Sequence, residues 1–385
     1  SAAQTFSAGG VNLLAGPNIS YGGGDPPTTP PNTPRGWIGK IHFQPASPCV
    51  NPPTPGTAVV DFPVVCVNKQ IELSVSGGTG GMNQAYQWET AATAAGPWTA
   101  LAAPAGTHIY NHTVTTTAFY RCKIVCSNNT PVYTNAVEVV ADNNLLAGNY
   151  TINRNAPTAG RNFTSFADFL QRLDCGISAP VIVDVVTGSG PYNERIAIGE
   201  ITGASATNYV RINGNGNTLQ FNSTSTANMH MVSLDGTSHL TIDNLHIKTL
   251  NASYGWGVFL TGGAHHDTIR NCHIDLSTIT GSSSVNANGI VMNGSGTSMS
   301  SAGQNANNIY IANNVINGGA ATSTYGAYYG IYMYGESSTA FGTDTIHIIN
   351  NEIKNFYYYG IYGYYNRVLN IEGNDIHKTG RSSAT

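Results

Sequence analysis

The chain repeats two six-residue phrases between Met231 and Ile376. The first phrase occurs as Met231-Val-Ser-Leu-Asp-Gly236, Gly257-Val-Phe-Leu-Thr-Gly262, Gly289-Ile-Val-Met-Asn-Gly294, Gly330-Ile-Tyr-Met-Tyr-Gly335 and Gly360-Ile-Tyr-Gly-Tyr-Tyr365. The second phrase follows each of these after a turn or loop, as Ile242-Asp-Asn-Leu-His-Ile247, Ile269-Arg-Asn-Cys-His-Ile274, Ile311-Ala-Asn-Asn-Val-Ile316, Ile348-Ile-Asn-Asn-Glu-Ile353 and Ile371-Glu-Gly-Asn-Asp-Ile376. Such repetition predicts a solenoid, in which each unit stacks on the one before it.

The interval between second phrases varies from 23 residues (Ile348 to Ile371) to 42 residues (Ile269 to Ile311), so a fixed core carries loops of variable length. The first phrase alternates apolar residues with others, as a strand with one buried face does. The two Ile residues of the second phrase lie five positions apart, and they share a buried face only if the chain bends between them. Asn stands at that bend. It tolerates the left-handed conformation, and its amide can bond to the same amide one coil away. Each coil therefore has three strands, and we predict a right-handed parallel β-helix over residues 181–385.

Both ends of the predicted β-helix need protection, because open strand edges invite aggregation. Residues 142–180 are predicted to connect and cap it. Within them, the apolar positions 166, 169, 170 and 173 share one helical face, Ser165 and Asp168 resemble a capping box, and Gly176 can end the helix. The last second phrase has no capping segment after it, so we expect the natural chain to continue beyond Thr385.

Charged residues make up 9% of the 385-residue chain, far below the roughly 25% of an average globular protein. The formal net charge of −4 gives no basic surface for nucleic acid, so we expect no nucleic-acid partner. The sequence shows neither a signal peptide nor an apolar run of about 20 residues, so we expect no membrane span. Six cysteines, four of them between positions 49 and 126, favour an oxidising, extracellular location over a metal site.

The region before the β-helix divides into two predicted parts. Residues 1–48 are rich in Gly and Pro, and the run 25–34 predicts an extended linker, while 36–43 could add a strand to the next domain or to a neighbouring molecule. Residues 49–141 predict an immunoglobulin-like sandwich with strands at 71–76, 86–88, 119–126 and 135–140, and Tyr120 has the spacing of a tyrosine corner.

The strand directions of such a sandwich predict which cysteines pair. The second and sixth strands run parallel, and the first strand runs the opposite way, so we expect the disulfides Cys66–Cys122 and Cys49–Cys126. Cys175 and Cys272 are expected to remain unpaired as small apolar residues.

The chain resembles, over about residues 49–385, the immunoglobulin-like modules and β-helices of large secreted surface proteins of Bacteroidetes. The resemblance is carried by Cys49-Val-Asn-Pro-Pro, Tyr86-Gln-Trp88, Gly96-Pro-Trp98, Tyr120-Arg-Cys122-Lys-Ile-Val-Cys126, Gly148-Asn-Tyr-Thr-Ile152, Phe163-Thr-Ser-Phe-Ala-Asp-Phe-Leu170 and Gly190-Pro-Tyr-Asn-Glu194. It implies a cell-surface or released protein exported by the type IX secretion system, although the C-terminal sorting domain of that route is absent from the sequence.

Many β-helices are polysaccharide lyases or hydrolases, which need a local cluster of acidic and basic side chains. Stacking the second phrases places His246 and His273 in one outward column and Lys248 and Asp275 in another, and no column gathers three acids. A catalytic group of His273, Asp275 and Arg270 is disfavoured against solvated pairs between coils. A metal site at His265-His266-Asp267 is likewise disfavoured, and the sequence predicts neither catalytic residues nor a metal or other cofactor.

Tyrosines give the strongest surface signal, because they crowd two successive coils. The predicted contact residues are Tyr332, Tyr334, Tyr362, Tyr364, Phe259, Tyr329 and Tyr358. Such rings can stack on sugars or on a protein, or they can be covered by the chain's own loops. The sequence favours a non-enzymatic extracellular surface protein, an adhesin or a surface-layer or filament component, with an extracellular glycan, a protein or another copy of itself as partner. The alternative is a carbohydrate-active β-helix enzyme, lyase or hydrolase, or a glycan-binding module.

Overall fold

The chain forms two compact units. The computed structural model describes residues 48–127, 130–303, 305–321, 323–336 and 344–378, and the backbone of 4–8 and 11–15. The predicted linker run 25–34 and the apolar segment 36–43 lie outside the described residues. The first unit comprises residues 1–59, 73–110 and 119–137, and the second comprises 60–72, 111–118 and 138–385. Within 1–48, where an extended linker was predicted, β1 (Gln4–Ala8) and β2 (Val11–Ala15) form an antiparallel hairpin.

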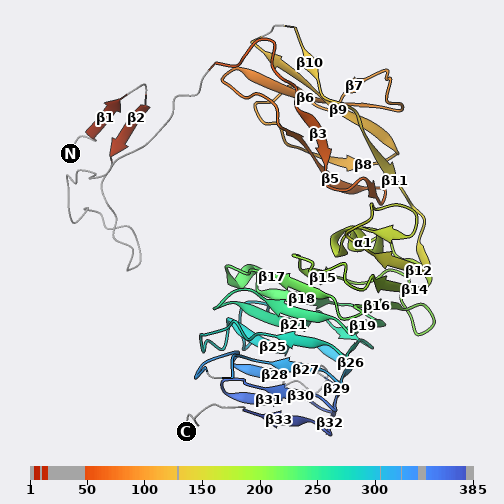
Figure 1. The fold of residues 1–385 in the computed structure, drawn as a ribbon, viewed down its shortest axis with the longest axis vertical. Coiled ribbons are helices and arrows are strands. Elements are labelled where there is room, and N and C mark those ends of the chain that lie inside the picture. The colour runs from red at the N-terminus through yellow and green to blue at the C-terminus, as the bar shows by residue number, and fades with distance from the viewer. Residues whose placement is uncertain are drawn as a thin grey trace. The chain divides into compact units, whose positions relative to one another are not determined.

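The strands between residues 57 and 141 form two sheets (Figure 1). The smaller sheet has the order β3 (Thr57–Val60), β5 (Lys69–Ser76), β8 (Tyr110–Val114). The larger has the order β4 (Val64–Val65), β11 (Val137–Ala141), β9 (Ala118–Cys126), β6 (Gln84–Ala91), β7 (Thr99–Ala100), with β10 (Val132–Tyr133) paired to β9. Every second residue of β9 is buried, as its alternating sequence predicts.

Two disulfides are present, and one of them corrects the predicted pairing. Cys49 bonds to Cys126, as the sequence suggested, but Cys66 bonds to Cys175. The predicted Cys66–Cys122 bond is wrong, because Cys66 follows β4 at the edge of its sheet while Cys122 lies on β9, beyond β11. Cys122 is instead a buried thiol opposite Trp88, and burial raises its pKa to about 12. Cys175, predicted to be free, is therefore paired, and Cys272 is a buried free thiol.

A short helix precedes the coils, where the capping pattern predicted it. Helix α1 (Phe166–Leu173) begins after Ser165, whose hydroxyl accepts a hydrogen bond from the backbone N–H of Asp168 at 3.0 Å. The carboxylate of Glu194 accepts the first two backbone N–H groups of the helix, from Phe166 and Ala167. Donors at a helix start otherwise lack partners, so these bonds fix where the helix begins. Its buried Phe166 and Phe169 belong to the same core as the strands.

The remaining strands wind as a parallel β-helix with three sheets (Figure 1). The first sheet begins with β13 (Asn162–Phe163), β12 (Leu146–Ile152) and β14 (Ile177–Val185) and continues through β16 (Val210–Asn213), β19 (Leu240–Asp243), β23 (Thr268–Arg270), β26 (Ala306–Ala312), β29 (Asp344–Ile349) and β32 (Leu369–Glu372), with β22 (Ala264–His265) paired to β26. The second contains β17 (Thr218–Phe221), β20 (His246–Thr249), β24 (His273–Asp275), β27 (Val315–Asn317), β30 (Glu352–Lys354) and β33 (Asp375–His377). The third contains β15 (Ile196–Ile198), β18 (His230–Asp235), β21 (Gly255–Thr261), β25 (Ala287–Met292), β28 (Tyr329–Tyr334) and β31 (Tyr359–Tyr364). A 3-10 turn, Thr226–Asn228, precedes β18.

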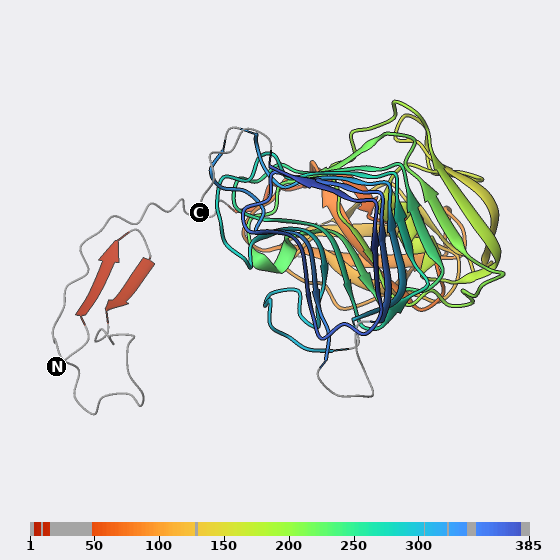
Figure 2. The same cartoon turned by 90° about the horizontal axis from the view of Figure 1, so that it is seen from below.

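The register of the coils is the one that the repeated phrases predict. The first Ile of each second phrase pairs with its counterpart from Ile242 through to Ile371, and the second Ile does the same from Ile247 to Ile376. Viewed along the stack, successive coils lie over one another (Figure 2). Apolar side chains from the three sheets meet in one continuous core, which excludes water along the stack.

The bend in each second phrase has the conformation that its Asn predicts. Asn244, Asn271, Asn313 and Asn350 all have positive φ between 51° and 57°, and Gly373 takes the position in the last coil. The amide ladder is formed by the residue that follows. Buried Asn314 donates from Nδ2 to Oδ1 of Asn351, and Asn351 donates likewise to Asn374, each at 2.9 Å. Buried amides that satisfy one another in this way lock the register of adjacent coils.

Candidate functional site

The predicted tyrosine columns exist in the expected register on the third sheet. Phe259, Val291, Tyr332 and Tyr362 pair in succession across β21, β25, β28 and β31. Tyr332 and Tyr362 stack with ring centres 5.6 Å apart and planes 4° apart. Coil stacking thus aligns side chains that lie about 30 residues apart in the sequence.

Much of this aromatic column is covered, which corrects the prediction that it is exposed. Phe259 and Tyr332 are each 4% exposed and pack with Met229, Trp256 and Val291. Two loops cover them. The Trp256 indole donates to the carbonyl of Val285 at 2.7 Å, and the Tyr332 hydroxyl donates to the carbonyl of Met299.

His230 links the buried aromatic residues to one of the covering loops. The His230 ring stacks on Phe259 with centres 4.7 Å apart, and its Nε2 bonds to the carbonyl of Gly296 at 2.7 Å. Burial raises the pKa of Tyr332, and it raises the pKa of Tyr329 to about 12. The covered end of the column is therefore a second, smaller core outside the β-helix, and it has no free contact surface.

The column emerges from its cover in the last described coils. Exposed rings there are Tyr359 (43%), Tyr364 (40%) and Tyr365 (45%), with Tyr362 partly buried between them. We call these four residues the tyrosine platform. Tyr359 and Tyr362 have ring centres 5.5 Å apart, and those of Tyr364 and Tyr365 are 4.1 Å apart. Of the remaining predicted contact residues, Tyr358 is exposed, while Tyr334 and Tyr329 are partly buried.

Sequence reasoning missed part of this platform. Tyr359 and Tyr365 were not among the predicted contacts, because alternation along the strand assigns outward positions only to Tyr362 and Tyr364. Tyr365 departs from the strand with φ of 53°, which turns its ring beside that of Tyr364. The run of aromatic residues from 357 to 359 signals such crowding, although not which rings are exposed.

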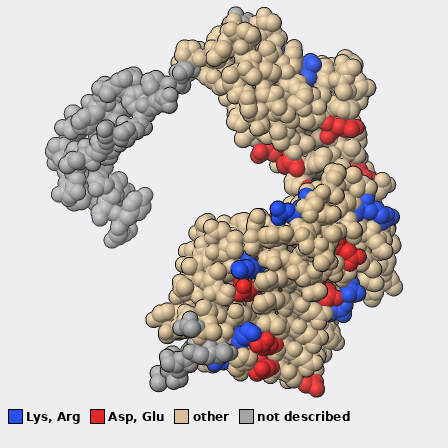
Figure 3. Space-filling view, in the orientation of Figure 1, with Lys and Arg blue, Asp and Glu red and all other residues tan. Residues whose placement is uncertain are grey.

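A second candidate site is the outer face of the second sheet, which carries polar and titratable side chains in two adjacent columns. We call it the titratable strip, and its main members are His246, Lys248, His273, Asp275, Glu352, Lys354, Asp375 and His377. His246 and His273 stack with ring centres 4.6 Å apart and planes 6° apart. On the face of the β-helix that Figure 3 shows, charges of both signs lie in small groups and few lie elsewhere.

Asp275 is the electrostatic centre of this strip. Its Oδ2 lies 3.7 Å from the Lys248 ammonium and 3.8 Å from His246 Nε2, and the latter separation is too long for a hydrogen bond. Burial alone would raise the pKa of Asp275, but His246, Ser277 and Lys248 outweigh burial and hold that pKa below its usual range. Desolvation and the neighbouring His246 lower the pKa of His273. The strip therefore sets an ionised carboxylate beside an imidazole that favours its neutral form.

The third member of the catalytic group considered from sequence does not join this strip. Arg270 lies on the first sheet, where its Nη2 donates to Asp243 Oδ2 at 2.8 Å, and Arg211 donates to the same oxygen at 2.7 Å. Asn271 bonds to the other carboxylate oxygen of Asp243 at 2.8 Å. Asp243 is fully partnered, and its role is to join three coils.

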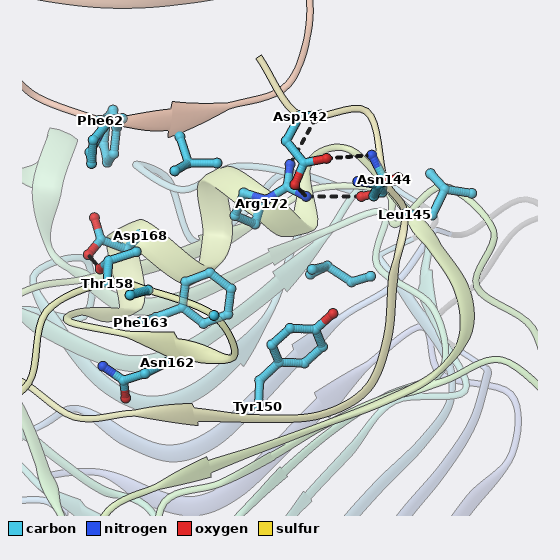
Figure 4. A pocket seen from close by; sticks show the side chains of 15 residues that line it. Phe62, Asp142, Asn144, Leu145, Tyr150, Thr158, Asn162, Phe163, Asp168 and Arg172 are labelled. Atoms are coloured by element: carbon cyan, nitrogen blue, oxygen red, sulfur yellow. Dashed lines mark hydrogen bonds and ion pairs between the residues drawn. The ribbon is translucent and has the colours of Figure 1, made fainter. Parts of the chain in front are cut away.

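A cavity of about 150 Å³ lies beside α1, lined by the helix and by the segments before it (Figure 4). Its charged groups are already partnered. Arg172 donates to the Asp142 carboxylate at 2.9 Å and to the carbonyl of Asn144 at 2.9 Å. Asp168 accepts from the Thr158 hydroxyl at 2.6 Å. These bonds tie the connector to the helix and leave the cavity without a free charge for a ligand.

Among the described residues, no three His, Cys, Asp or Glu side chains already converge in a way that could hold a metal ion. The helices of the described part include none that is long and apolar enough to span a membrane.

Comparison with known proteins yields one similarity, in structure. No protein-family model and no curated protein sequence matches the chain. A family 28 exopolygalacturonase from Yersinia enterocolitica is similar in structure, with 10% sequence identity and a TM-score of 0.30, over 84% of this chain and 86% of that one.

The expectation of a non-enzymatic adhesin or surface-layer component is corrected at this point. Phe259 and Tyr332, on which that expectation depended, are buried beneath the chain's own loops.

Proposed function

We propose that this chain is a carbohydrate-recognising β-helix protein, and that the tyrosine platform is its contact surface. Sugars present flat C–H faces with hydroxyl groups around the edge. Tyrosine matches both features, because its ring is apolar and its hydroxyl both donates and accepts hydrogen bonds.

The observation that carries this proposal is a cluster of tyrosine rings in mutual contact on and beside β31. The ring centres of Tyr359 and Tyr362 are 5.5 Å apart, and those of Tyr364 and Tyr365 are 4.1 Å apart. Isolated exposed aromatic residues are ordinary, but a contiguous cluster of them marks a contact surface. The Tyr364 hydroxyl donates a hydrogen bond to the Tyr365 hydroxyl at 3.3 Å, so a ligand that reaches one of them also meets the other.

Binding to a panel of neutral and acidic polysaccharides, measured by calorimetry, tests this proposal. Changing Tyr359, Tyr364 and Tyr365 together to Ser should lower affinity about 10- to 1,000-fold, because each aromatic contact contributes about 0.5–1.5 kcal/mol beyond its area. The matched control is Tyr209→Ser, since Tyr209 is 38% exposed elsewhere on the β-helix. Unchanged binding by the triple variant would remove the platform from the proposal.

A second candidate function is cleavage of the bound glycan at the titratable strip. It is favoured by the presence of ionised Asp275 on the same strand as His273, which stacks on His246 and whose lowered pKa supports the neutral base form. A neutral imidazole could remove the proton next to the carboxylate of a uronic acid, with which lyase cleavage begins. Assays for new reducing ends and for unsaturated uronate would detect hydrolysis and elimination. Activity should fall at least 100-fold in His273→Ala, and activity that survives both this change and Asp275→Asn would exclude the strip.

Two further features belong to this proposal. We infer an extracellular location, supported by the two disulfides, which persist in oxidising compartments. We also infer that residues 49–141 are an immunoglobulin-like scaffold of the Bacteroidetes type, carried on a type IX secretion substrate. Buried Tyr120 and Trp88 support the scaffold assignment, although Cys122 lacks the disulfide that such domains often carry.

A further inference from the structure

Three histidines meet on the turns that precede β19 and β23, away from the tyrosine platform and the titratable strip. His239 and His266 occupy equivalent positions in consecutive coils, two residues before the paired Thr241 and Thr268. Both have positive φ, 54° and 57°, as do the residues at this bend in the next two coils. The coil geometry therefore imposes the bend, and stacking places one histidine over the other. His265 precedes His266 and completes what we call the histidine triad.

The spacing within the triad matches that of a metal site. The ring centres of His239 and His266 are 4.9 Å apart, those of His265 and His266 are 5.3 Å apart, and those of His239 and His265 are 6.1 Å apart. With metal–nitrogen bonds of about 2.0–2.1 Å and a ring centre about 1.1 Å beyond each nitrogen, three imidazoles around a tetrahedral ion have centres about 5.2 Å apart. The observed separations bracket this value.

The hydrogen bonds of the triad leave nitrogen atoms available. His265 Nδ1 lies 3.1 Å from the carbonyl of Gly263, to which it donates as N–H, so its Nε2 carries the free lone pair. Metal-binding histidines are commonly oriented by such a bond from the other ring nitrogen to a carbonyl. The rings of His239 and His266 have no hydrogen-bond partner within the part of the chain that the structure describes.

Hydrogen bonds hold the two turns beneath the triad together, and binding of one ion requires a change only in the rings. Buried Asp267 accepts hydrogen bonds from the Thr237 hydroxyl at 2.5 Å and from the backbone N–H of Leu240 at 2.9 Å, which joins the two turns. The rings of His239 and His266 now lie nearly parallel, 16° apart, so convergence on one ion requires rotation of one ring about its Cβ–Cγ bond. His266 is exposed, and no neighbouring group blocks that rotation by a hydrogen bond within the described residues.

We propose that the histidine triad binds a divalent transition-metal ion of the kind that prefers imidazole, such as Zn²⁺, Ni²⁺ or Cu²⁺. Three protein ligands leave the fourth position open to water or to another exchangeable ligand. The ion would join two consecutive coils through side chains 26 and 27 residues apart in the sequence. This proposal does not depend on the carbohydrate function, because the triad shares no residue with either carbohydrate site.

Zinc binding by the 385-residue chain tests the proposal, and the chain must lack a polyhistidine tag, which would itself bind metal. After treatment with a chelator and removal of the chelator, titration calorimetry with zinc chloride should show one equivalent bound per chain. His239→Ala, His265→Ala and His266→Ala should each lower the affinity at least tenfold. The matched control is the double variant His246→Ala/His273→Ala, which removes another stacked histidine pair and should bind zinc as the wild type does.

Copper supplies a second readout that does not rely on affinity. The electron paramagnetic resonance spectrum of one equivalent of Cu²⁺ should show coupling to several imidazole nitrogens, and this coupling should fall stepwise in the single variants. Circular dichroism establishes that each variant is folded. Failure of the wild-type chain to bind zinc stoichiometrically would overturn the proposal, as would binding that survives in all three triad variants or that is lost in the control.

Discussion

Asp267 offers a direct test of how the coils are held together, because it occupies an inward position that neighbouring coils fill with Leu240 and Ile309. Its side chain is fully buried, and burial raises its pKa from 3.8 to about 6. The Thr237 and Leu240 hydrogen bonds offset only part of that effect. The change Asp267→Asn replaces the carboxylate with a neutral group of the same shape that can still bond to Thr237.

The effect of Asp267→Asn on the free energy of unfolding follows from the linkage between protonation and folding. An acid whose pKa is raised in the folded state favours folding most below its unfolded pKa, and this advantage disappears as the pH rises through about 6. The shift of about two units corresponds to roughly 3 kcal/mol at pH 8. When the pH falls from 8 to 5, protonation of Asp267 should raise the free energy of unfolding of the wild type by about 1.4 kcal/mol. Asp267→Asn should be more stable than the wild type by up to about 3 kcal/mol at pH 8, with a smaller difference at pH 5.

Urea denaturation at both pH values, followed by circular dichroism with a chelator present, measures this difference. Asp243→Asn is the control, because the arginine and asparagine contacts lower the pKa of Asp243 despite burial. A lowered carboxyl pKa contributes stability above its unfolded value, and this contribution is lost only at lower pH, so it stays constant between pH 8 and pH 5. The control should therefore lose stability equally at both. If Asp267→Asn is destabilised at pH 8, or if its difference from the wild type does not shrink at pH 5, the reasoning is refuted.

Three other outcomes can be measured on the same chain. Tyr332→Ala should destabilise the chain by about 3–5 kcal/mol because it empties a buried site, whereas Tyr364→Ala should cost less than about 1 kcal/mol; equal losses in urea denaturation would contradict the assignment of a covered and an exposed end. Cys272→Asn should extend the amide ladder, because Cys272 N–H already bonds to Asn314 Oδ1 and the new amide can donate to that oxygen; a gain of about 1 kcal/mol is expected, and a loss would show that the site does not accept an amide. Non-reducing peptide mapping should link Cys66 to Cys175, and replacing both with Ser should cost up to about 4–5 kcal/mol for a loop of 109 residues; a Cys66–Cys122 peptide would overturn this pairing.

Local sequence pattern determined the coil of this protein. Alternation along the Gly-flanked run and the five-residue spacing of Ile are properties of one repeat, so they predict three strands and a bend in each coil wherever the repeat occurs. The left-handed conformation of Asn271 and Asn313 follows from the residue type at the bend. The start of α1 follows from Ser165 and the apolar face behind it. In each case the interactions that decide the structure lie within a few residues or recur in every coil.

Tertiary structure decided which surfaces are free and which distant side chains meet. The loops over Phe259 and Tyr332 are held by contacts such as that between His230 and Gly296, 66 residues apart, and no periodicity encodes such a contact. The partner of Cys66 depends on where α1 leaves Cys175, at a sequence separation of 109 residues. The histidine triad likewise forms only because stacking brings His239 over His266. A repeated phrase fixes the conformation of a coil, whereas exposure and long-range pairing depend on the whole path of the chain.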